Sequence, residues 1–186
     1  MGWNNHAMKT TPFLDEMSKS GTILRNSYAT HRCTPSRAGL LTGRYPFRYG
    51  LGAEAMDNMA PTGLDPKEKL LPEFFKAGGY STHMIGKWHL GFCKNSYKPT
   101  SRGFDTSFGN YGGQINYFNH TVKLHFYFSS SFNGLKGNIF LSTKLFNLQV
   151  GEFSGNIDYF RNDEPVFNEN YCGEDYTNEA IDIAKV

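Results

Sequence analysis

Apolar residues recur with helical spacing in three segments of the chain, which cover residues 11–21, 72–79 and 176–184. The first two segments have a proline in their first turn and glycine at their end, which is typical of helix boundaries. In the second segment, both phenylalanine side chains are expected to pack inward. The apolar residues on these helices are Phe13, Leu14 and Met17, then Phe74 and Phe75, and finally Ala180, Ile181 and Ala184.

Short segments between the helices have the pattern of β-strands, at residues 22–28 and 80–85. The sequence Asp65-Pro-Lys-Glu68 has the form of a capping box and predicts a helix start ahead of Pro72. Helices that alternate with strands indicate an α/β fold with a largely parallel sheet. Sites in such sheets lie at the carboxyl ends of strands, so the segments after residues 28 and 85 are expected to meet at one crevice.

A further short helix is predicted directly after Cys33. Thr34 is a favourable N-cap, Pro35 suits the first helical position, and Gly43 suits the position just past the helix end. The free N–H groups and the positive end of the helix dipole would then point at Cys33 and favour an anion there. Arg37 adds a fork of hydrogen-bond donors near the same point.

Lys87 and His89 lie two residues apart, and in an extended segment both side chains face the same way. A cation and a titratable imidazole on one surface suit the binding of an oxyanion and the transfer of a proton to a leaving group. These two residues are therefore the second candidate group for chemistry.

The composition narrows the class of protein. The chain has 186 residues, of which 39% are hydrophobic and 19% charged, and these values indicate one globular domain. A net charge of +2 does not indicate nucleic acid as a partner, and no apolar run is long enough for a transmembrane helix. Of the three cysteines, Cys93 and Cys172 are available to pair with each other if Cys33 is modified.

Several motifs resemble the sulfatase family. Cys33-Thr-Pro-Ser-Arg followed by Thr-Gly-Arg44 resembles the first sulfatase signature, and Gly86-Lys-Trp-His-Leu-Gly91 resembles the second letter for letter. Arg102-Gly-Phe-Asp105 continues the likeness, which covers residues 1–119 and is strongest to arylsulfatases of the B type. The resemblance implies an incomplete alkaline-phosphatase-like α/β fold, with a mixed, largely parallel sheet and flanking helices. Residues 1–186 would form part of the N-terminal catalytic domain.

The resemblance also implies a function, which is hydrolysis of an aryl or sugar sulfate ester. Cys33, Pro35 and Arg37 match the minimal pattern read by the formylglycine-generating enzyme, which would convert Cys33 to formylglycine. A hydrate oxygen on that residue would attack sulfur while Arg37 holds the hydrate. Lys87 would bind the sulfate oxygens, and His89 would hydrogen-bond the hydrate or the ester oxygen. Calcium, held in part by the oxygen derived from Cys33, would act as a Lewis acid.

Other functions remain open. The chain is alternatively an inert fragment or gene-model product that carries sulfatase motifs, or a phosphate or phosphonate monoester hydrolase of the same superfamily. A thiol phosphatase, which would use a thiolate at a helix N-terminus, is disfavoured. Those enzymes place five residues between Cys and Arg, whereas three separate Cys33 from Arg37.

The resemblance implies that several functional residues are missing. In the family, two adjacent aspartates at the end of the first strand bind calcium, but no Asp precedes Asp15 here. The later metal ligands, a second His and a second Lys are expected beyond Val186. We therefore expect little or no activity from this 186-residue form. The family implies a lysosomal or secreted enzyme, and the absence of a signal peptide at residues 1–6 points to a missing N-terminus.

Residues 124–151 show no sulfatase resemblance, which resumes weakly near residues 155–160 and 176–180. This segment is either a hairpin insert or translated non-coding sequence such as a retained intron. The abrupt change in composition favours the second interpretation. Asn119-His-Thr121 is an N-glycosylation sequon and fits a secreted or lysosomal glycoprotein. His120 and His125 are interpreted as surface residues rather than metal ligands.

Overall fold

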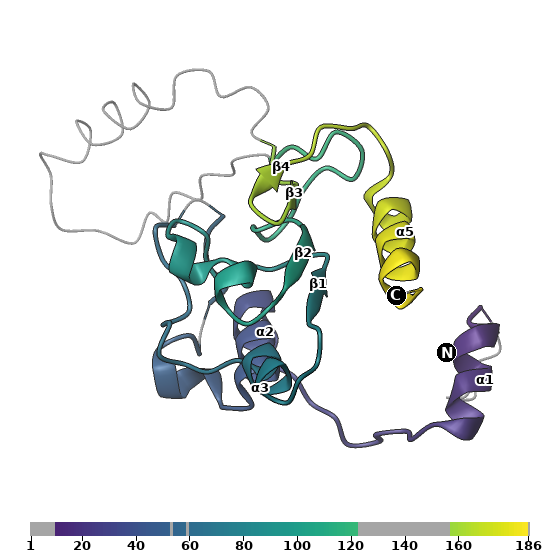
Figure 1. The fold of residues 1–186 in the computed structure, drawn as a ribbon. Coiled ribbons are helices and arrows are strands. Elements are labelled where there is room, and N and C mark those ends of the chain that lie inside the picture. Colours follow the sequence, from purple (N-terminus) through teal and green to yellow (C-terminus); the bar gives the residue numbers. More distant parts are fainter. Residues whose placement is uncertain (1–9, 53, 59, 123–156, 186) are drawn as a thin grey trace, which may run out of the picture.

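The fold is known from a computed structural model, which describes residues 10–52, 54–58, 60–122 and 157–185 (Figure 1). The helices in these ranges are α1 (Pro12–Ser20), α2 (Cys33–Thr42), α3 (Leu71–Ala77) and α5 (Cys172–Ala184), with 3-10 turns η2 (Pro46–Tyr49), η3 (Asn95–Tyr97) and η4 (Pro99–Ser101). The strands are β1 (His83–Ile85), β2 (Thr106–Gly109), β3 (Phe160–Arg161) and β4 (Glu164–Pro165).

The four strands form one mixed sheet in the order β1-β2-β3-β4. β1 and β2 are parallel, with His83 opposite Thr106, whereas β2–β3 and β3–β4 are antiparallel. Figure 1 shows α2 and α3 on one side of β1 and α5 on the other, where α5 contacts both β1 and β2. The predicted mixed α/β architecture is confirmed, although within the described ranges only the β1–β2 pair is parallel.

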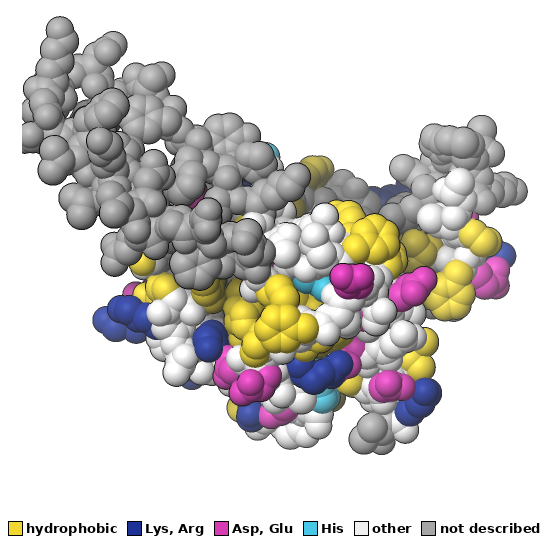
Figure 2. Space-filling view, turned by 90° about the horizontal axis from the view of Figure 1, so that it is seen from above, with side chains coloured by type: hydrophobic (Ala, Val, Ile, Leu, Met, Phe, Trp, Pro, Cys, Tyr) yellow, Lys and Arg dark blue, Asp and Glu magenta, His cyan; other side chains and the backbone are white. Residues whose placement is uncertain are grey.

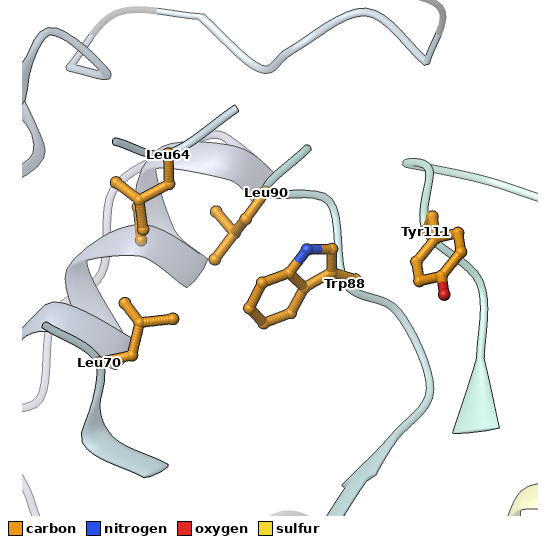
Figure 3. Packing of buried hydrophobic residues seen from close by; sticks show 6 residues of the cluster. Leu64, Leu70, Trp88, Leu90 and Tyr111 are labelled. Carbon is orange, nitrogen blue, oxygen red and sulfur yellow. The ribbon is translucent and has the colours of Figure 1, made fainter. Parts of the chain in front are cut away.

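The main hydrophobic core lies between α2 and the segment that follows β1. Figure 3 shows Leu64, Leu70 and Leu90 pointing toward one another beside the Trp88 ring. All four side chains are at most 1% exposed. The Trp88 indole N–H is also satisfied, because it donates to the carbonyl of Tyr97 at 2.9 Å. Burial of Trp88 and Leu90 therefore fixes the backbone on both sides of residue 89.

A second cluster lies between the sheet and α5 and is built around Phe108, Tyr159 and Cys172. His120 belongs to this region, since its ring stacks on Tyr159 with the centroids 4.0 Å apart and is 0% exposed. The prediction that His120 is a surface residue is therefore wrong. The imidazole ring of His120 packs like an aromatic side chain. The local sequence around His120 does not reveal this burial, because its partner Tyr159 lies far away along the chain. His125 lies outside the described residues.

The predicted helices form, but their packing differs from the prediction. α1 ends at Gly21 as expected, yet it buries no residue and Phe13 is 74% exposed. α3 ends at Gly78 as expected, whereas the predicted inward packing of Phe74 and Phe75 is wrong. These two side chains are 59% and 45% exposed. Phe75 packs edge-on against Tyr80 on the surface, at a centroid distance of 5.5 Å.

The strand predicted at residues 22–28 does not form. This segment is exposed along its whole length and pairs with none of the described strands. A strand is stabilised by hydrogen bonds to a neighbouring strand. Without such a neighbour, the backbone N–H and C=O groups of an extended segment bond to water, and the strand is not stable. The second predicted strand does form, but only residues 83–85 pair, as β1.

The predicted start of α3 with Pro72 in its first turn is confirmed, whereas the start predicted at residues 65–68 and the start of α5 differ from the prediction. Residues 65–68 form a turn and not a helix start. The Asp65 carboxylate closes this turn by accepting the Lys67 N–H at 2.9 Å. α3 is capped instead by the Glu73 carboxylate, which accepts the Leu70 N–H at 3.1 Å. α5 begins at Cys172 and thus includes one more turn than the segment predicted from residue 176.

Candidate functional site

The cysteine of the first motif lies at the N-terminal end of α2. The helix begins at Cys33 itself, after Arg32 in an extended conformation with φ −120° and ψ 153°. Thr34 is therefore inside the first turn, and its predicted role as N-cap is wrong. Gly43 ends the helix in the left-handed region at φ 66°, as predicted. Cys33 is a partly exposed free thiol beside the positive end of the helix dipole, where an anion is stabilised.

Arg37 connects this helix to the second motif. Its Nε donates to the Trp88 carbonyl at 2.8 Å, and its Nη2 donates to the Lys87 carbonyl. Burial lowers the pKa of the Arg37 guanidinium, and the nearby Cys33 opposes that shift. Arginine titrates so far above neutrality that Arg37 keeps its charge beside the cysteine. The two motifs meet, as the sequence predicted.

The segment that carries Lys87 and His89 continues the pairing of β1 with β2 beyond the strand ends. The Trp88 N–H donates to the Asn110 carbonyl at 2.8 Å, and the His89 N–H donates to the Tyr111 carbonyl at 2.9 Å. His89 has φ 58°, so the extended conformation expected from the sequence ends at this residue. A left-handed backbone at a non-glycine residue is strained and persists only where surrounding contacts hold it.

His89 is the most enclosed of the four predicted site residues, at 5% exposure. Its Nε2 lies 2.8 Å from the Met56 carbonyl, and because a carbonyl only accepts, Nε2 carries the proton. Its Nδ1 is buried, and no described group forms a hydrogen bond with it. Burial is the main cause that lowers the pKa of His89; Lys87 and Arg37 lower it further. His89 is therefore neutral at pH 7, with Nδ1 as an acceptor.

A glycine pair forms the wall of the site beside His89. The Asp158 carboxylate accepts the Gly112 N–H at 2.7 Å, and the Asn58 side-chain oxygen accepts the Gly113 N–H at 2.5 Å. A Cβ at Gly113 would lie 2.6 Å from the Cε1 atom of His89, so only glycine fits there. Burial raises the pKa of the Asp158 carboxyl, and its bonds to backbone N–H groups oppose that shift.

Four residues that support His89 were not recognised from their place in the sequence: Thr34, Met56, Asn58 and Gly113. Only the adjacent glycines at 112 and 113 carried a local signal, since paired glycines mark a close approach of the backbone to another group. The other three residues bond across 22 or more positions in sequence, and spacing alone does not reveal such contacts.

The described residues do not fit the predicted calcium ion. Calcium takes six to eight oxygen ligands, mostly from carboxylates. Among the residues that the structure describes, no three His, Cys, Asp or Glu side chains lie close enough together to hold a metal ion. The charged residues that bear most directly on His89 are the cations Lys87 and Arg37.

A disulfide between Cys93 and Cys172 and a glycan on Asn119 are the two other modifications considered from the sequence. Cys93 is an exposed free thiol and Cys172 a buried one, so they are not paired. Asn119 is exposed in a turn, and the Thr121 hydroxyl donates to the Asn119 side-chain oxygen at 2.8 Å. Among the described helices, none has the length and apolar character required to cross a membrane.

Comparisons with known proteins place these motifs in one family. The model of the family described as Sulfatase matches residues 1–184. Arylsulfatase J of Mus musculus is 42% identical over 120 residues, which cover 64% of this chain and 20% of that protein. N-acetylgalactosamine-6-sulfatase of Homo sapiens is 39% identical over 123 residues, which cover 59% of this chain and 23% of that protein. The chain thus spans about a fifth of the length of these relatives.

Solved structures share the fold. The crystal structure of Ps i-CgsB superposes with a TM-score of 0.75 and 27% identity over 99% of this chain and 38% of that one. The same protein in complex with k-i-k-neocarrahexaose superposes equally well, at 25% identity. The family match over nearly the whole chain, together with the meeting of the two signature motifs at the start of α2, shows that this chain belongs to the sulfatase family.

Proposed function

We propose that this chain supplies the nucleophile half of the active site of a sulfuric ester hydrolase. The observation that carries the proposal is the pair of hydrogen bonds from Arg37 of the first motif to the Lys87 and Trp88 carbonyls of the second. These two bonds hold the cysteine helix against the segment that carries Lys87 and His89. Arg37 lies near Cys33, and Lys87 and Arg37 bear on the neutral imidazole of His89. A nucleophile at a helix N-terminus with such a group of cations nearby suits attack on an anionic ester.

The proposed reaction uses Cys33 as formylglycine hydrate. One hydrate hydroxyl gives up its proton as its oxygen forms a bond to sulfur, and the ester S–O bond breaks so that the alcohol leaves with that proton. The second hydrate hydroxyl then loses its proton, sulfate is expelled, and the aldehyde is restored. Arg37 orients the hydrate and Lys87 neutralises charge on the sulfate oxygens. His89, kept neutral by burial, accepts a proton or hydrogen bond at Nδ1.

The proposed substrate class is an aryl or sugar sulfate, because the relatives carry the names arylsulfatase and N-acetylgalactosamine-6-sulfatase. We also propose a lysosomal or secreted location, with a glycan on Asn119. Exposure of Asn119 supports that modification, since the acceptor must reach the transferring enzyme. Production in a secretory host is expected to give a glycosidase-sensitive mass that Asn119→Gln lacks. An unsubstituted chain whose mass does not change on glycosidase treatment would overturn the glycan proposal.

Mass spectrometry of the Cys33 peptide tests the first step of the proposed function. Co-expression with the formylglycine-generating enzyme is expected to convert the thiol to the aldehyde. Arg37→Ala should abolish the conversion, because Arg37 belongs to the recognised pattern. Ser36→Ala is the matched control and should be converted like the unsubstituted chain. A thiol that persists in the unsubstituted chain would contradict the proposal and favour the inert-fragment alternative.

A phosphate or phosphonate monoester hydrolase is the second candidate function. No observation in the described residues favours it over sulfate ester hydrolysis, because Arg37 and Lys87 attract either anion. The two candidate functions are separated by an assay of the full-length enzyme with its cysteine converted to formylglycine. The rates of hydrolysis of an aryl sulfate and of an aryl phosphate are compared.

A further inference from the structure

A closed loop of hydrogen bonds surrounds the residue next to Cys33. The Met56 N–H donates to the Thr34 hydroxyl oxygen at 3.0 Å, and the Thr34 hydroxyl donates to the His89 carbonyl at 3.1 Å. The His89 Nε2–H donates to the Met56 carbonyl at 2.8 Å and completes the loop. Thr34 is 0% exposed, so no water replaces these bonds. The Thr34 oxygen both accepts and donates, which among side chains of this size only a hydroxyl does.

The loop determines which nitrogen of His89 is free. Because Met56 offers a carbonyl, His89 must present a proton on Nε2 to form the bond. The neutral ring then carries its lone pair on Nδ1, which is the buried atom without a partner among the described residues. If Met56 moved, the bond that selects this tautomer would weaken. A buried nitrogen without a hydrogen-bond partner costs free energy. The bond to the Met56 carbonyl is therefore needed to keep Nδ1 in this unpartnered position.

The loop also holds a strained backbone. His89 lies at φ 58°, and its carbonyl is the acceptor of the Thr34 hydroxyl. Its N–H is held from the other side by the Tyr111 carbonyl at 2.9 Å. Both bonds are needed because a histidine in the left-handed region relaxes toward other conformations when it is not held.

We propose that Thr34 is a positioning residue, which acts through Met56 and the His89 carbonyl to hold the His89 ring with Nδ1 as its free acceptor. Thr34 follows Cys33 in the first turn of α2, so one residue links the geometry of the nucleophile to the geometry of the histidine. The value of this arrangement for ester cleavage rests on the proposed function. The position and tautomer of the ring do not, because they are present with Cys33 as a thiol.

The test is nitrogen NMR of the 186-residue chain, labelled at histidine and purified without the formylglycine-generating enzyme. His89→Gln identifies the signals of His89 among the six histidines. The unsubstituted chain and Thr34→Ser are expected to show His89 with the proton on Nε2. Thr34→Val, which keeps the shape but loses the hydroxyl, is expected to raise the population of the Nδ1–H tautomer several-fold.

Two results would overturn the proposal. One is an Nδ1–H tautomer of His89 in the unsubstituted chain, which decides the matter even if Thr34→Val does not fold. The other is a folded Thr34→Val protein whose His89 keeps both its tautomer and its titration unchanged. Neither result depends on conversion of Cys33, so a failure of this inference is distinguishable from a failure of the proposed function.

Discussion

The Gly113 backbone packs directly against the His89 ring, and this contact allows the effect of a larger residue at position 113 to be predicted. An added Cβ would lie 2.6 Å from His89 Cε1 and 2.9 Å from the Asn58 side-chain oxygen, closer than such atoms approach in proteins. We expect Gly113→Ala to lower the free energy of unfolding by about 1–3 kcal/mol, because the ring or the loop must shift. Urea denaturation measures this change, and NMR of His89 detects the displacement.

Gly39→Ala is the control for that substitution. Gly39 lies within α2, where an added Cβ meets Pro46 Cγ at 3.4 Å, an ordinary contact. Alanine in a helix is more favourable than glycine by about 0.5–1 kcal/mol, so stability should stay equal or rise. Gly113→Ala with the stability and His89 signals of the unsubstituted chain would show that the ring does not need this space.

For individual residues, the sequence predicted that the two motifs meet but not which contacts hold them. Cys33, Arg37, Lys87 and His89 were identified because their motifs resemble a family. The expected convergence of two strand ends holds only for the second motif, since residues 22–28 form no strand before Cys33. The burial of Thr34 was not predictable, since it follows from partners 22 and 55 residues away. His120 was misplaced for the same reason, because its ring packs on Tyr159 from a distant segment.

At the scale of elements, one carboxylate joins α3 to the starts of β1 and β2. Asp105 accepts the Thr82 N–H at 2.9 Å and the Thr82 hydroxyl at 3.1 Å, and it pairs with Lys76 at 2.6 Å. The bond with Lys76 and then those with Thr82 lower the pKa of the Asp105 carboxyl from 3.8 to about 2. The folded state therefore binds this proton less readily than the unfolded state does.

The sign of the pH dependence follows from that shift. The stability from Asp105 is present above pH 4 and is lost as the pH falls from about 4 to about 2. Asp105→Asn is expected to lower the thermal unfolding midpoint at pH 7 and to flatten the decline between these two pH values. Asp182→Asn, which removes an exposed pair with Lys185, is the control. Parallel pH curves for Asp105→Asn and the unsubstituted chain would contradict the assignment.

Element boundaries were predictable where local chemistry sets them. Pro12 and Gly21 delimit α1, Gly78 ends α3, and Gly43 ends α2 in a left-handed conformation. Predictions that required a partner were less successful. Residues 22–28 have a strand-like sequence but no described strand to pair with, and the inward packing of the α3 phenylalanines required a surface that the described chain does not provide.

At the scale of the whole molecule, the described chain exposes many large apolar side chains. Figure 2 shows hydrophobic side chains gathered at the centre of one face with charged side chains around them. Those more than 60% exposed anywhere in the described ranges are Phe13, Leu24, Tyr28, Leu40, Tyr45, Phe47, Tyr80 and Phe167. Exposed apolar surface of this extent is typical of a face that other protein covers.

Activity and calcium binding of the 186-residue chain depend on the groups that it contains. Its described residues hold Arg37 near Cys33 but no cluster of three or more His, Cys, Asp or Glu side chains able to hold a metal ion, so we expect no turnover of an aryl sulfate even after conversion of Cys33. Calcium should also leave the thermal unfolding midpoint unchanged relative to a chelator. An ion bound at 100 times its Kd would add about 2.7 kcal/mol of stability, which a thermal scan detects. Cys33→Ala gives the background for the assay. Turnover near that of a full-length relative, or a calcium-dependent rise in the midpoint, would show that the chain completes its own site.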